Sequence, residues 1–314
     1  LPIYIDVIAE AGADAVKFQT HIAEAESTPE EPWRVKFSKQ DKTRYDYWKR
    51  MEFTKAQWKG LKEHAEKKGL LFLSSPFSFE AVDLLEDIGI KVWKIASGEV
   101  NNTPLLDKIA QTKKAVIISS GMSTIKELDQ AVNLFKKKGI QYGVMQCTAA
   151  YPCPPEKIGL NLIHDFRQRY KCPVGLSDHS GTIFPGLAGA ASGIDLLEIH
   201  VTFSSQMFGP DVDASVTLEE LKTLVEGIRY IEQLNANPVK KDDIYFEMRS
   251  VRKLFTKSII TKNKLKKGMI LKNEDLTFKK PGNGIPPGEI NNIIGKKLIR
   301  DVPEDHFLSM DDLV

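Results

Sequence analysis

The sequence predicts an α/β protein: a (β/α)8 TIM barrel followed by a small C-terminal domain. Three observations predict it. Short apolar runs of β type alternate with helical patterns, polar residues follow the ends of those runs, and a linker-like segment precedes the last part of the chain. Strands that alternate with helices are typical of a parallel sheet.

Seven runs rich in β-branched and aromatic residues are expected to form the strands of this sheet. They are residues 15–19, 70–74, 92–96, 115–119, 142–147, 174–177 and 196–200. A barrel of parallel strands closes with eight. The chain opens inside an apolar helical pattern, Tyr4 to Ala11, that ought to follow a strand. We therefore expect the first strand, with any catalytic residue on it, to lie upstream of Leu1.

Two of the intervening helices carry capping boxes, in which a threonine is followed three residues later by a glutamate. Thr124 and Glu127 open one helix, and Thr217 and Glu220 open another. Apolar residues at helical spacing then predict the buried faces. They are Ile125, Leu128, Val132 and Phe135 in the first helix, and Leu221, Leu224, Val225 and Ile228 in the second.

We predict a barrel domain over residues 1–234, a linker over 235–253 and a small domain over 254–314. Asn235 to Pro238 and the charged run after it are typical of a linker. The small domain shows short apolar strands at 258–260 and 298–299 and a turn-rich segment at 281–288. Such a module has little core of its own. We expect it to pack against the barrel of its own chain or of a partner.

Composition bounds the function classes. The 314 residues are 42% hydrophobic and 27% charged with a net charge of +2, so no nucleic-acid partner is implied. Cys147, Cys153 and Cys172 are an odd number without paired spacing, which favours a reducing compartment, most simply the cytoplasm. No apolar run approaches the roughly 20 residues that span a bilayer, so no membrane role is expected.

Two of the apolar runs end in histidine one β-α-β unit apart, at His179 and His200. Parallel α/β folds keep their chemistry at the carboxyl ends of strands, so the two imidazoles could share one divalent metal. Imidazole with carboxylate and water oxygens suits manganese, iron, cobalt or zinc, in an open catalytic site rather than a structural one. The alternative for each is an ordinary hydrogen-bonded histidine.

Polar residues at the other strand ends should converge on the same mouth of the barrel. They are Lys17, Gln19, Ser75, Lys94, Ser97, Glu99, Ser119, Tyr151 and Ser177. Two lysines with several hydroxyls suit a phosphate and a carboxylate. Each lysine could instead be an exposed edge residue, although Lys94 lies between Trp93 and Ile95 in an apolar run, which weakens that alternative.

Eight motifs, taken in order, resemble those of bacterial sialic acid synthases, the family of N-acetylneuraminate, legionaminate and pseudaminate synthases. The likeness runs from Tyr4 to Leu313. The motifs are Ala15-Val-Lys-Phe-Gln-Thr20, Ser75-Pro-Phe77, Lys94-Ile-Ala-Ser-Gly-Glu99, Ser119-Ser-Gly-Met122, Cys147-Thr-Ala-Ala-Tyr-Pro152, Gly175-Leu-Ser-Asp-His179, Gly209-Pro-Asp211 and Lys280-Pro-Gly-Asn-Gly284.

The resemblance implies a barrel followed by an antifreeze-like (SAF) domain that reaches over the partner's active site in a domain-swapped homodimer. It implies condensation of phosphoenolpyruvate with the open-chain aldehyde of an N-acetylated hexose, such as N-acetylmannosamine or a 2,4-diacetamido-6-deoxyhexose. The products are a nine-carbon 2-keto sugar acid and phosphate.

Residue roles follow from the same resemblance. His179 and His200 would hold a divalent metal, usually Mn²⁺, with Mg²⁺ or Co²⁺ as alternatives. Glu99 would handle protons, Tyr151 and Asp211 would lie near the sugar, and Lys280 would reach the partner's sugar. Gln19 is a further substrate-binding candidate at the barrel mouth. The phosphoenolpyruvate positions would be Lys17, Ser75, Lys94, Ser97, Ser119 and Ser177.

The sequence departs from the family's pattern at three places. The first-strand motif with its catalytic glutamate is not found, Ala149 stands where asparagine is frequent, and Lys280 stands where arginine is frequent. Lysine keeps the charge but loses the bidentate fork. Another phosphoenolpyruvate-condensing or metal-dependent aldolase-type barrel, or a degenerate sugar-binding barrel, stays open as an alternative. A second reading of Glu99 is a simple ion-pair partner for Lys94.

Overall fold

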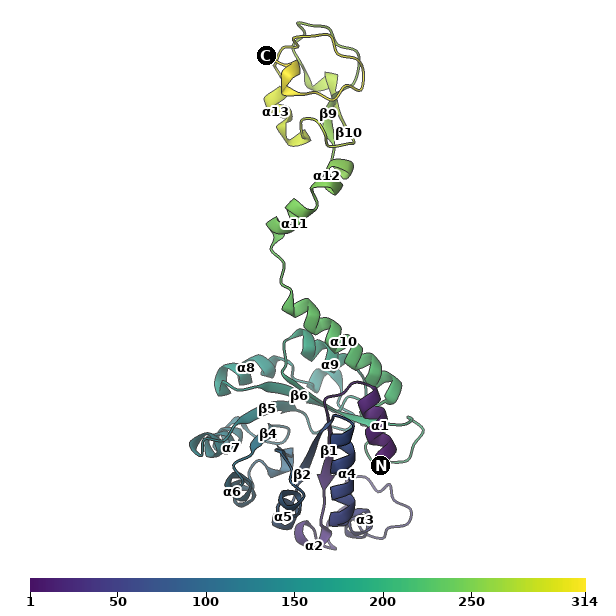
Figure 1. Cartoon of the computed structure of the whole chain (residues 1–314), viewed down its shortest axis with the longest axis vertical. Helices are drawn as coiled ribbons and strands as arrows, with labels where there is room; N and C mark the ends of the chain where they lie inside the picture. The colour runs from purple at the N-terminus through teal and green to yellow at the C-terminus, as the bar shows by residue number, and fades with distance from the viewer. The chain divides into compact units, whose positions relative to one another are not determined.

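The computed structural model describes residues 1–314 and divides them into two compact units, Leu1–Ala236 and Asn237–Val314. The first unit is built on one sheet of eight parallel strands that pair in sequence order and curl as in a (β/α)8 barrel (Figure 1). The strands are β1 Ala15–Thr20, β2 Leu71–Pro76, β3 Val92–Ile95, β4 Ala115–Ser119, β5 Tyr142–Cys147, β6 Val174–Asp178, β7 Leu196–Thr202 and β8 Ser215–Thr217.

The seven predicted strands are all present, and β8 is an eighth that the sequence did not reveal. It is three residues long and pairs with the end of β7, from His200 opposite Ser215 to Thr202 opposite Thr217. Two of its three residues are polar, so no apolar run marks it in the sequence. β1 and β8 are the two ends of the pairing order.

Helices follow the strands and lie around the outside of the curled sheet (Figure 1). They are α1 Pro2–Glu10, α2 Ala23–Glu26, α3 Arg44–Met51, α4 Lys55–Lys67, α5 Phe79–Asp87, η1 Ser97–Glu99, α6 Thr103–Gln111, α7 Ile125–Lys137, η2 Pro155–Lys157, α8 Asn161–Tyr170, α9 Phe184–Ala191, η3 Val212–Ala214 and α10 Leu218–Ala236. None of the chain's helices is long and apolar enough to cross a membrane.

Both predicted capping boxes form. Thr124 Oγ1 accepts from the Glu127 N–H at 3.3 Å, and the Glu127 carboxylate accepts from the Thr124 N–H at 2.8 Å. The Thr217 box repeats this with an oxygen of Glu220 that accepts from the Thr217 N–H at 2.7 Å. On α7 the predicted buried face is correct except for Ile125, which is 43% exposed because it is the first residue of the helix.

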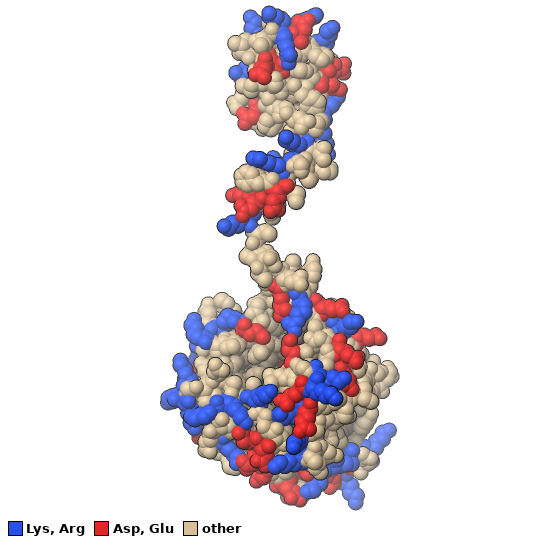
Figure 2. Space-filling view, viewed as in Figure 1, with Lys and Arg blue, Asp and Glu red and all other residues tan.

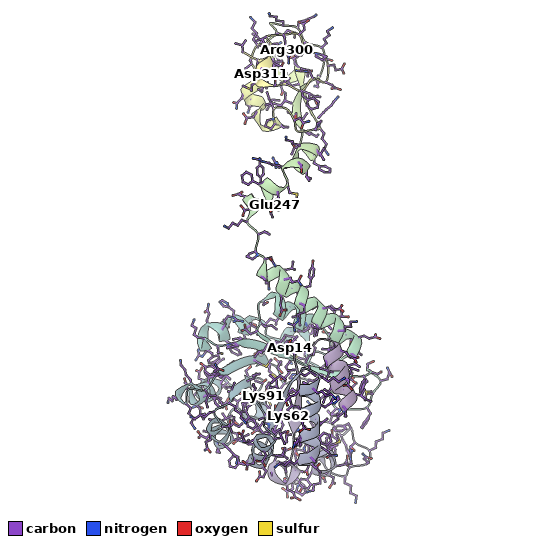
Figure 3. The ribbon with its side chains drawn as sticks, in the orientation of Figure 1. Asp14, Lys62, Lys91, Glu247, Arg300 and Asp311 are labelled. Atoms are coloured by element: carbon purple, nitrogen blue, oxygen red, sulfur yellow. The ribbon has the colours of Figure 1, made fainter.

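Ion pairs on the surface form both within helices and between elements distant in sequence. Arg229 of α10 donates to both oxygens of Asp14, at 2.7 and 2.8 Å, just before β1 (Figure 3). Lys62 and Lys91, both labelled in Figure 3, approach the Glu66 carboxylate at 2.8 and 3.0 Å. Exposed pairs of this kind each contribute at most about 1 kcal/mol. Positively and negatively charged side chains are interspersed over the surface seen in Figure 2, in keeping with the small net charge.

The second unit has a core of its own around a two-stranded antiparallel sheet. Its elements are α11 Lys241–Glu247, α12 Arg249–Phe255, β9 Ser258–Thr261, η4 Asn273–Asp275, β10 Leu276–Lys279, η5 Pro287–Glu289, α13 Ile290–Ile293 and η6 Met310–Asp312. The predicted strand at 258–260 is present as β9. The one at 298–299 was wrong: Leu298 makes only an isolated bridge, to Leu313. Two short helices, α11 and α12, start within the predicted linker.

Candidate active site

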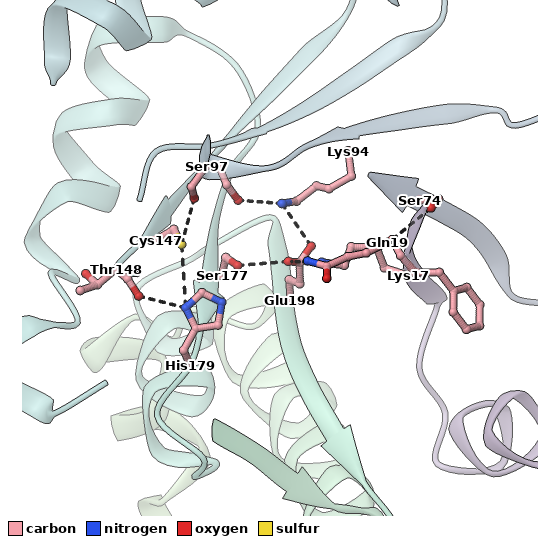
Figure 4. A network of polar contacts seen from close by, with 12 residues as sticks. Lys17, Gln19, Ser74, Lys94, Ser97, Cys147, Thr148, Ser177, His179 and Glu198 are labelled. Atoms are coloured by element: carbon pink, nitrogen blue, oxygen red, sulfur yellow. Dashed lines mark hydrogen bonds and ion pairs between the residues drawn. The ribbon is translucent and has the colours of Figure 1, made fainter. Parts of the chain in front are cut away.

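The centre of the site is a carboxylate between two lysines, on the inward face of the sheet (Figure 4). Lys17 Nζ of β1 donates to Glu198 Oε1 of β7 at 2.9 Å, and Lys94 Nζ of β3 lies 3.4 Å from Glu198 Oε2. Ser177 of β6 donates to the same Oε1 at 3.2 Å. The predicted lysines therefore do meet, but a charge of opposite sign lies between them.

Lys94 is buried, with 2% of its surface exposed, and its ammonium also donates to Ser119 Oγ at 2.7 Å. Burial lowers the pKa of Lys94, although the Glu198 carboxylate opposes that shift. Burial alone would raise the pKa of Glu198, but Lys17 and Lys94 outweigh it and hold that carboxyl well below its usual range. Glu198 is therefore ionised at neutral pH.

Glu198 was missed by the sequence reasoning, which considered only His200 on this strand. Side chains alternate between the two faces of a strand. Glu198 lies two residues before His200, so both point to the same face of β7. The sequence did hold a signal for Glu198: it is a charged residue in a largely apolar strand, two residues from the candidate metal ligand His200.

Hydroxyls complete this part of the site. Ser75 of β2 is 1% exposed, and its Oγ has no hydrogen-bond partner in the protein. Ser97 accepts from the Gly121 N–H at 3.2 Å and donates to Cys147 Sγ at 3.5 Å. A Cβ on Gly121 would lie 2.6 Å from Ser97 Oγ, so only glycine lets these turns approach so closely. An unpartnered buried hydroxyl is an open position for a polar ligand.

The two histidines lie together, with ring centroids 5.2 Å apart. His179 is buried, and its Nδ1 donates to the Thr148 carbonyl at 2.9 Å, which leaves Nε2 free (Figure 4). Burial lowers the pKa of His200, so its imidazole is neutral. The Tyr151 ring lies beside both, with its centroid 4.2 Å from that of His179 and 6.0 Å from that of His200.

These imidazoles fit a divalent metal in an open site. A histidine that donates one ring nitrogen to a carbonyl, as His179 does to Thr148, presents its other nitrogen in the manner typical of metal ligands. No group of three or more His, Cys, Asp and Glu side chains is arranged to hold a metal. A metal at this place would have the two imidazoles as its protein ligands, and its remaining positions would belong to water and substrate oxygens.

Glu99 lies apart from the lysines. Its carboxylate accepts from Asn102 Nδ2 at 2.7 Å, and burial raises its pKa although that hydrogen bond opposes the shift. Lys94 pairs with Glu198 and Ser119, so the alternative reading of Glu99 as an ion-pair partner of Lys94 was wrong. A half-buried carboxyl with a raised pKa suits proton transfer near neutral pH.

The remaining predicted residues lie at the rim or in the second unit. Asp211 precedes η3, and its Oδ1 accepts from Arg34 Nη2 at 2.8 Å. Gln19 is exposed at the end of β1, with its Oε1 3.5 Å from His21 Nε2. Lys280 is exposed in the second unit, and its Nζ lies 5.0 Å from the centroid of the Phe255 ring.

A curled parallel sheet with its polar site at the carboxyl ends of the strands defines the class of (β/α)8-barrel enzymes. Residues 4–240 match the NeuB family, and residues 256–314 match the SAF domain. The chain belongs to the NeuB family of sialic acid synthases, as the motifs indicated, and is a transferase.

Similar proteins are named as synthases of sialic-acid-type sugar acids. An N,N'-diacetyllegionaminic acid synthase of Campylobacter jejuni is 34% identical over 97% of this chain and 92% of its own length. The human N-acetylneuraminate-9-phosphate synthase is 34% identical over 99% of this chain and 87% of its own. An N-acetylneuraminic acid synthetase from Leptospira borgpetersenii, solved with citrate, superimposes with a TM-score of 0.70 at 30% identity, covering 79% of this chain and 85% of that one.

A 3-deoxy-D-arabino-heptulosonate 7-phosphate synthase from Thermotoga maritima superimposes with a TM-score of 0.58 at 15% identity. The match covers 76% of this chain and 83% of that one. That likeness shows the fold alone. The barrel, the SAF domain and the named relatives together support the sialic-acid-type reaction over the other condensing and aldolase-type enzymes that the sequence left open.

Proposed function

We propose that this transferase condenses phosphoenolpyruvate with the open-chain aldehyde of an N-acetylated hexose to give a nine-carbon 2-keto sugar acid and phosphate. One observation carries the proposal: two lysines of β1 and β3, with serine hydroxyls around them, lie on the same sheet that presents a pair of imidazoles at β6 and β7. The first set suits a ligand with phosphate and carboxylate groups, and the second suits a metal-bound carbonyl.

Lys17 and Lys94 would bind the anionic groups of phosphoenolpyruvate. The hydroxyls of Ser75, Ser97, Ser119 and Ser177 would complete the cradle, and the unpartnered Ser75 Oγ is the position most open to a ligand. Because Glu198 already offsets one positive charge, the site would bind the trianion without a large surplus of buried cations in the empty enzyme.

His179 and His200 would hold the divalent metal, for which we propose Mn²⁺, with Mg²⁺ or Co²⁺ as substitutes. The metal would polarise the aldehyde oxygen of the acceptor. The Thr148 carbonyl orients His179 for this task through its hydrogen bond to Nδ1.

In the balanced reaction, C3 of phosphoenolpyruvate bonds to the aldehyde carbon, water adds to C2, and cleavage of the C2–oxygen bond releases phosphate. Glu99 would exchange the protons that water brings and that the product takes up. Tyr151 and Asp211 would contact the acceptor, because both lie at the rim beside the histidines or on the adjoining loop. Gln19, exposed at the end of β1, would be a further substrate contact. We further propose a domain-swapped homodimer in which Lys280 reaches the partner's site.

The decisive experiment measures phosphate release from phosphoenolpyruvate with Mn²⁺ and one candidate acceptor at a time, N-acetylmannosamine, its 6-phosphate or a 2,4-diacetamido-6-deoxyhexose. We expect release that depends on one of these acceptors, falls to background with a chelator and returns with added Mn²⁺. The His200→Ala variant should lose bound metal and turnover together. Release that ignores every acceptor, or that survives metal removal, would contradict the corresponding part of the proposal.

A further inference from the structure

Arg34 joins two rim residues of the site, although nothing in the sequence singled it out. It lies between α2 and α3, and its Nη2 donates to Asp211 Oδ1 at 2.8 Å. Its Cζ lies 4.5 Å from the centroid of the Tyr151 ring. One guanidinium therefore contacts both proposed acceptor residues, which follow β5 and β7 in the chain.

Each contact limits the freedom of its partner. A planar guanidinium stacked on an aromatic face restrains the ring, and the ring of Tyr151 is the one that lies 4.2 Å from His179. Pairing through Oδ1 fixes the Asp211 carboxylate and leaves Oδ2 without a hydrogen bond from the protein. That second oxygen is open to hydroxyls of a sugar.

A second contact ties the same two segments. The Phe37 ring lies 6.0 Å from Phe208, which precedes Asp211 by three residues, and 4.9 Å from Tyr47 on α3. The segment after α2 is therefore anchored to α3 on one side and to the segment before η3 on the other. Arg34 is held between fixed points rather than at the tip of a free loop.

We propose that Arg34 is a positioning residue for the acceptor: it holds Tyr151 and Asp211 in the arrangement that receives the sugar beside the two histidines. This inference rests on the proposed function. Arg34 and Asp211 are partly exposed, with 46% and 35% of their side-chain surfaces accessible, so the pair adds little to stability. Its effect lies in the orientation of two groups that would otherwise sample several rotamers.

Steady-state kinetics of Arg34→Ala test the inference. We expect the KM for the acceptor to rise about tenfold or more while the KM for phosphoenolpyruvate changes less than about twofold, because one oriented charge-assisted contact is lost only on the acceptor side. Arg34→Lys should recover part of the loss, since lysine keeps the charge without the planar face. A similar rise in both KM values, or no rise in either, would overturn the inference.

Arg44→Ala is the matched control. Arg44 is also an arginine of this region that pairs with a carboxylate, Glu31 at 3.2 Å, and lies 5.3 Å from an aromatic ring, that of Trp48. It contacts neither Tyr151 nor Asp211, so its loss should leave the acceptor KM unchanged. An equal acceptor defect in this control would reduce Arg34 to a general support of the segment and contradict the positioning role.

A binding measurement separates this inference from the proposed function. Hydrogen exchange of wild type and Arg34→Ala should show faster exchange in residues 203–214 of the variant, and added acceptor should slow that exchange only in wild type. Turnover in wild type with equal protection of both proteins overturns the positioning role alone. No turnover with any acceptor overturns the proposed function and this inference with it.

Discussion

Lys17 and Lys94 share one carboxylate, that of Glu198. The net positive charge of the site is therefore smaller than that of two unpaired lysines. Glu198 accepts from Lys17 at 2.9 Å and lies 3.4 Å from Lys94. Burial costs each charged group several kcal/mol unless it is paired. Glu198 therefore offsets part of the positive charge of the buried Lys94 and the half-buried Lys17.

Lys94→Met tests the anion site. Methionine keeps most of the aliphatic volume but removes the ammonium, so we expect the KM for phosphoenolpyruvate to rise roughly 100-fold, the size of a lost charged hydrogen bond. The acceptor KM should change much less. Lys91→Met is the control, because Lys91 is an exposed lysine just before β3 that pairs only with Glu66. Equal losses for both substrates would contradict an anion site at Lys94.

Glu198→Gln tests the shared carboxylate. The buried Lys94 and the half-buried Lys17 would then lack their counter-charge, and we expect the free energy of unfolding to fall by roughly 3 kcal/mol. Inorganic phosphate should restore more stability to the variant than to wild type, because it supplies the missing negative charge. Thermal unfolding with and without phosphate measures this, with the exposed Glu226→Gln as control. Equal stabilisation of both proteins by phosphate would show that the ligand does not approach the lysines.

Asn102→Asp tests Glu99 as a proton-transfer group. Asp at position 102 retains the cap of α6, in which the Asn102 Oδ1 accepts from Leu105 N–H at 3.3 Å. It replaces the donor to Glu99 with a second negative charge, which must raise the pKa of Glu99 further. If Glu99 acts as a base, the acidic limb of the kcat profile should move to higher pH, and if it acts as an acid, the basic limb should. Profiles that coincide with wild type would rule out both roles.

At the scale of elements, the alternation of side chains along strands assembles the site. β6 presents Ser177 and then His179 just beyond its end, and β7 presents Glu198 and then His200, each pair two residues apart. Ser177 and Glu198, which come first along their strands, face the lysines. His179 and His200, which follow them, form the histidine pair. Two adjacent strands thus place the proposed anion and metal sites one above the other.

In the second unit, the turn η6 carries a buried carboxylate that the core depends on. Asp312 is 0% exposed and accepts from Ser309 N–H and His306 Nε2, both at 2.9 Å. Arg300 Nε, whose residue is labelled in Figure 3, donates at 2.6 Å. Burial raises the pKa of Asp312, but these hydrogen bonds outweigh it and bring the pKa to about 2.

Asp312→Asn should therefore destabilise this unit by about 2 kcal/mol at neutral pH, since each unit of pKa depression is worth about 1.4 kcal/mol. Because the folded pKa is depressed, the contribution is present above the usual aspartate pKa and is lost as pH falls through about 4 to 2. Hydrogen exchange of β9 at pH 7 and pH 3 measures it, and the gap between wild type and variant should narrow at the lower pH. The exposed neighbour Asp311→Asn should behave like wild type throughout.

At the scale of the whole molecule, the chain is two units with separate cores, and the proposed reaction requires both if Lys280 serves a partner's site. Mixing a Lys280→Ala protein with a Lys94→Met protein tests this. Some assembled dimers would pair an intact barrel with an intact Lys280, so the mixture should be more active than the sum of its parts. Activity that never exceeds that sum would favour a site completed within one chain.

Much of the barrel could be predicted from local pattern. Capping boxes such as Thr124 with Glu127, and apolar runs ending in polar residues, are set by nearest neighbours and by burial. The strand β8 could not be predicted in this way, because Ser215–Thr217 is polar and short, and only pairing with β7 makes it a strand. The same holds for Leu298, whose apolar run forms a bridge rather than a strand.

The sequence by itself determined the parallel α/β architecture, the family and the lysines, serines and histidines at the strand ends, because each depends on short-range pattern or on a motif. Only the tertiary structure decided what these residues touch: Glu198 between two lysines, and Arg34 against Tyr151 and Asp211. These partners lie up to 181 positions apart in the chain, as for Lys17 and Glu198. Curling of the sheet brings them together, and spacing along the sequence carries no record of that curvature.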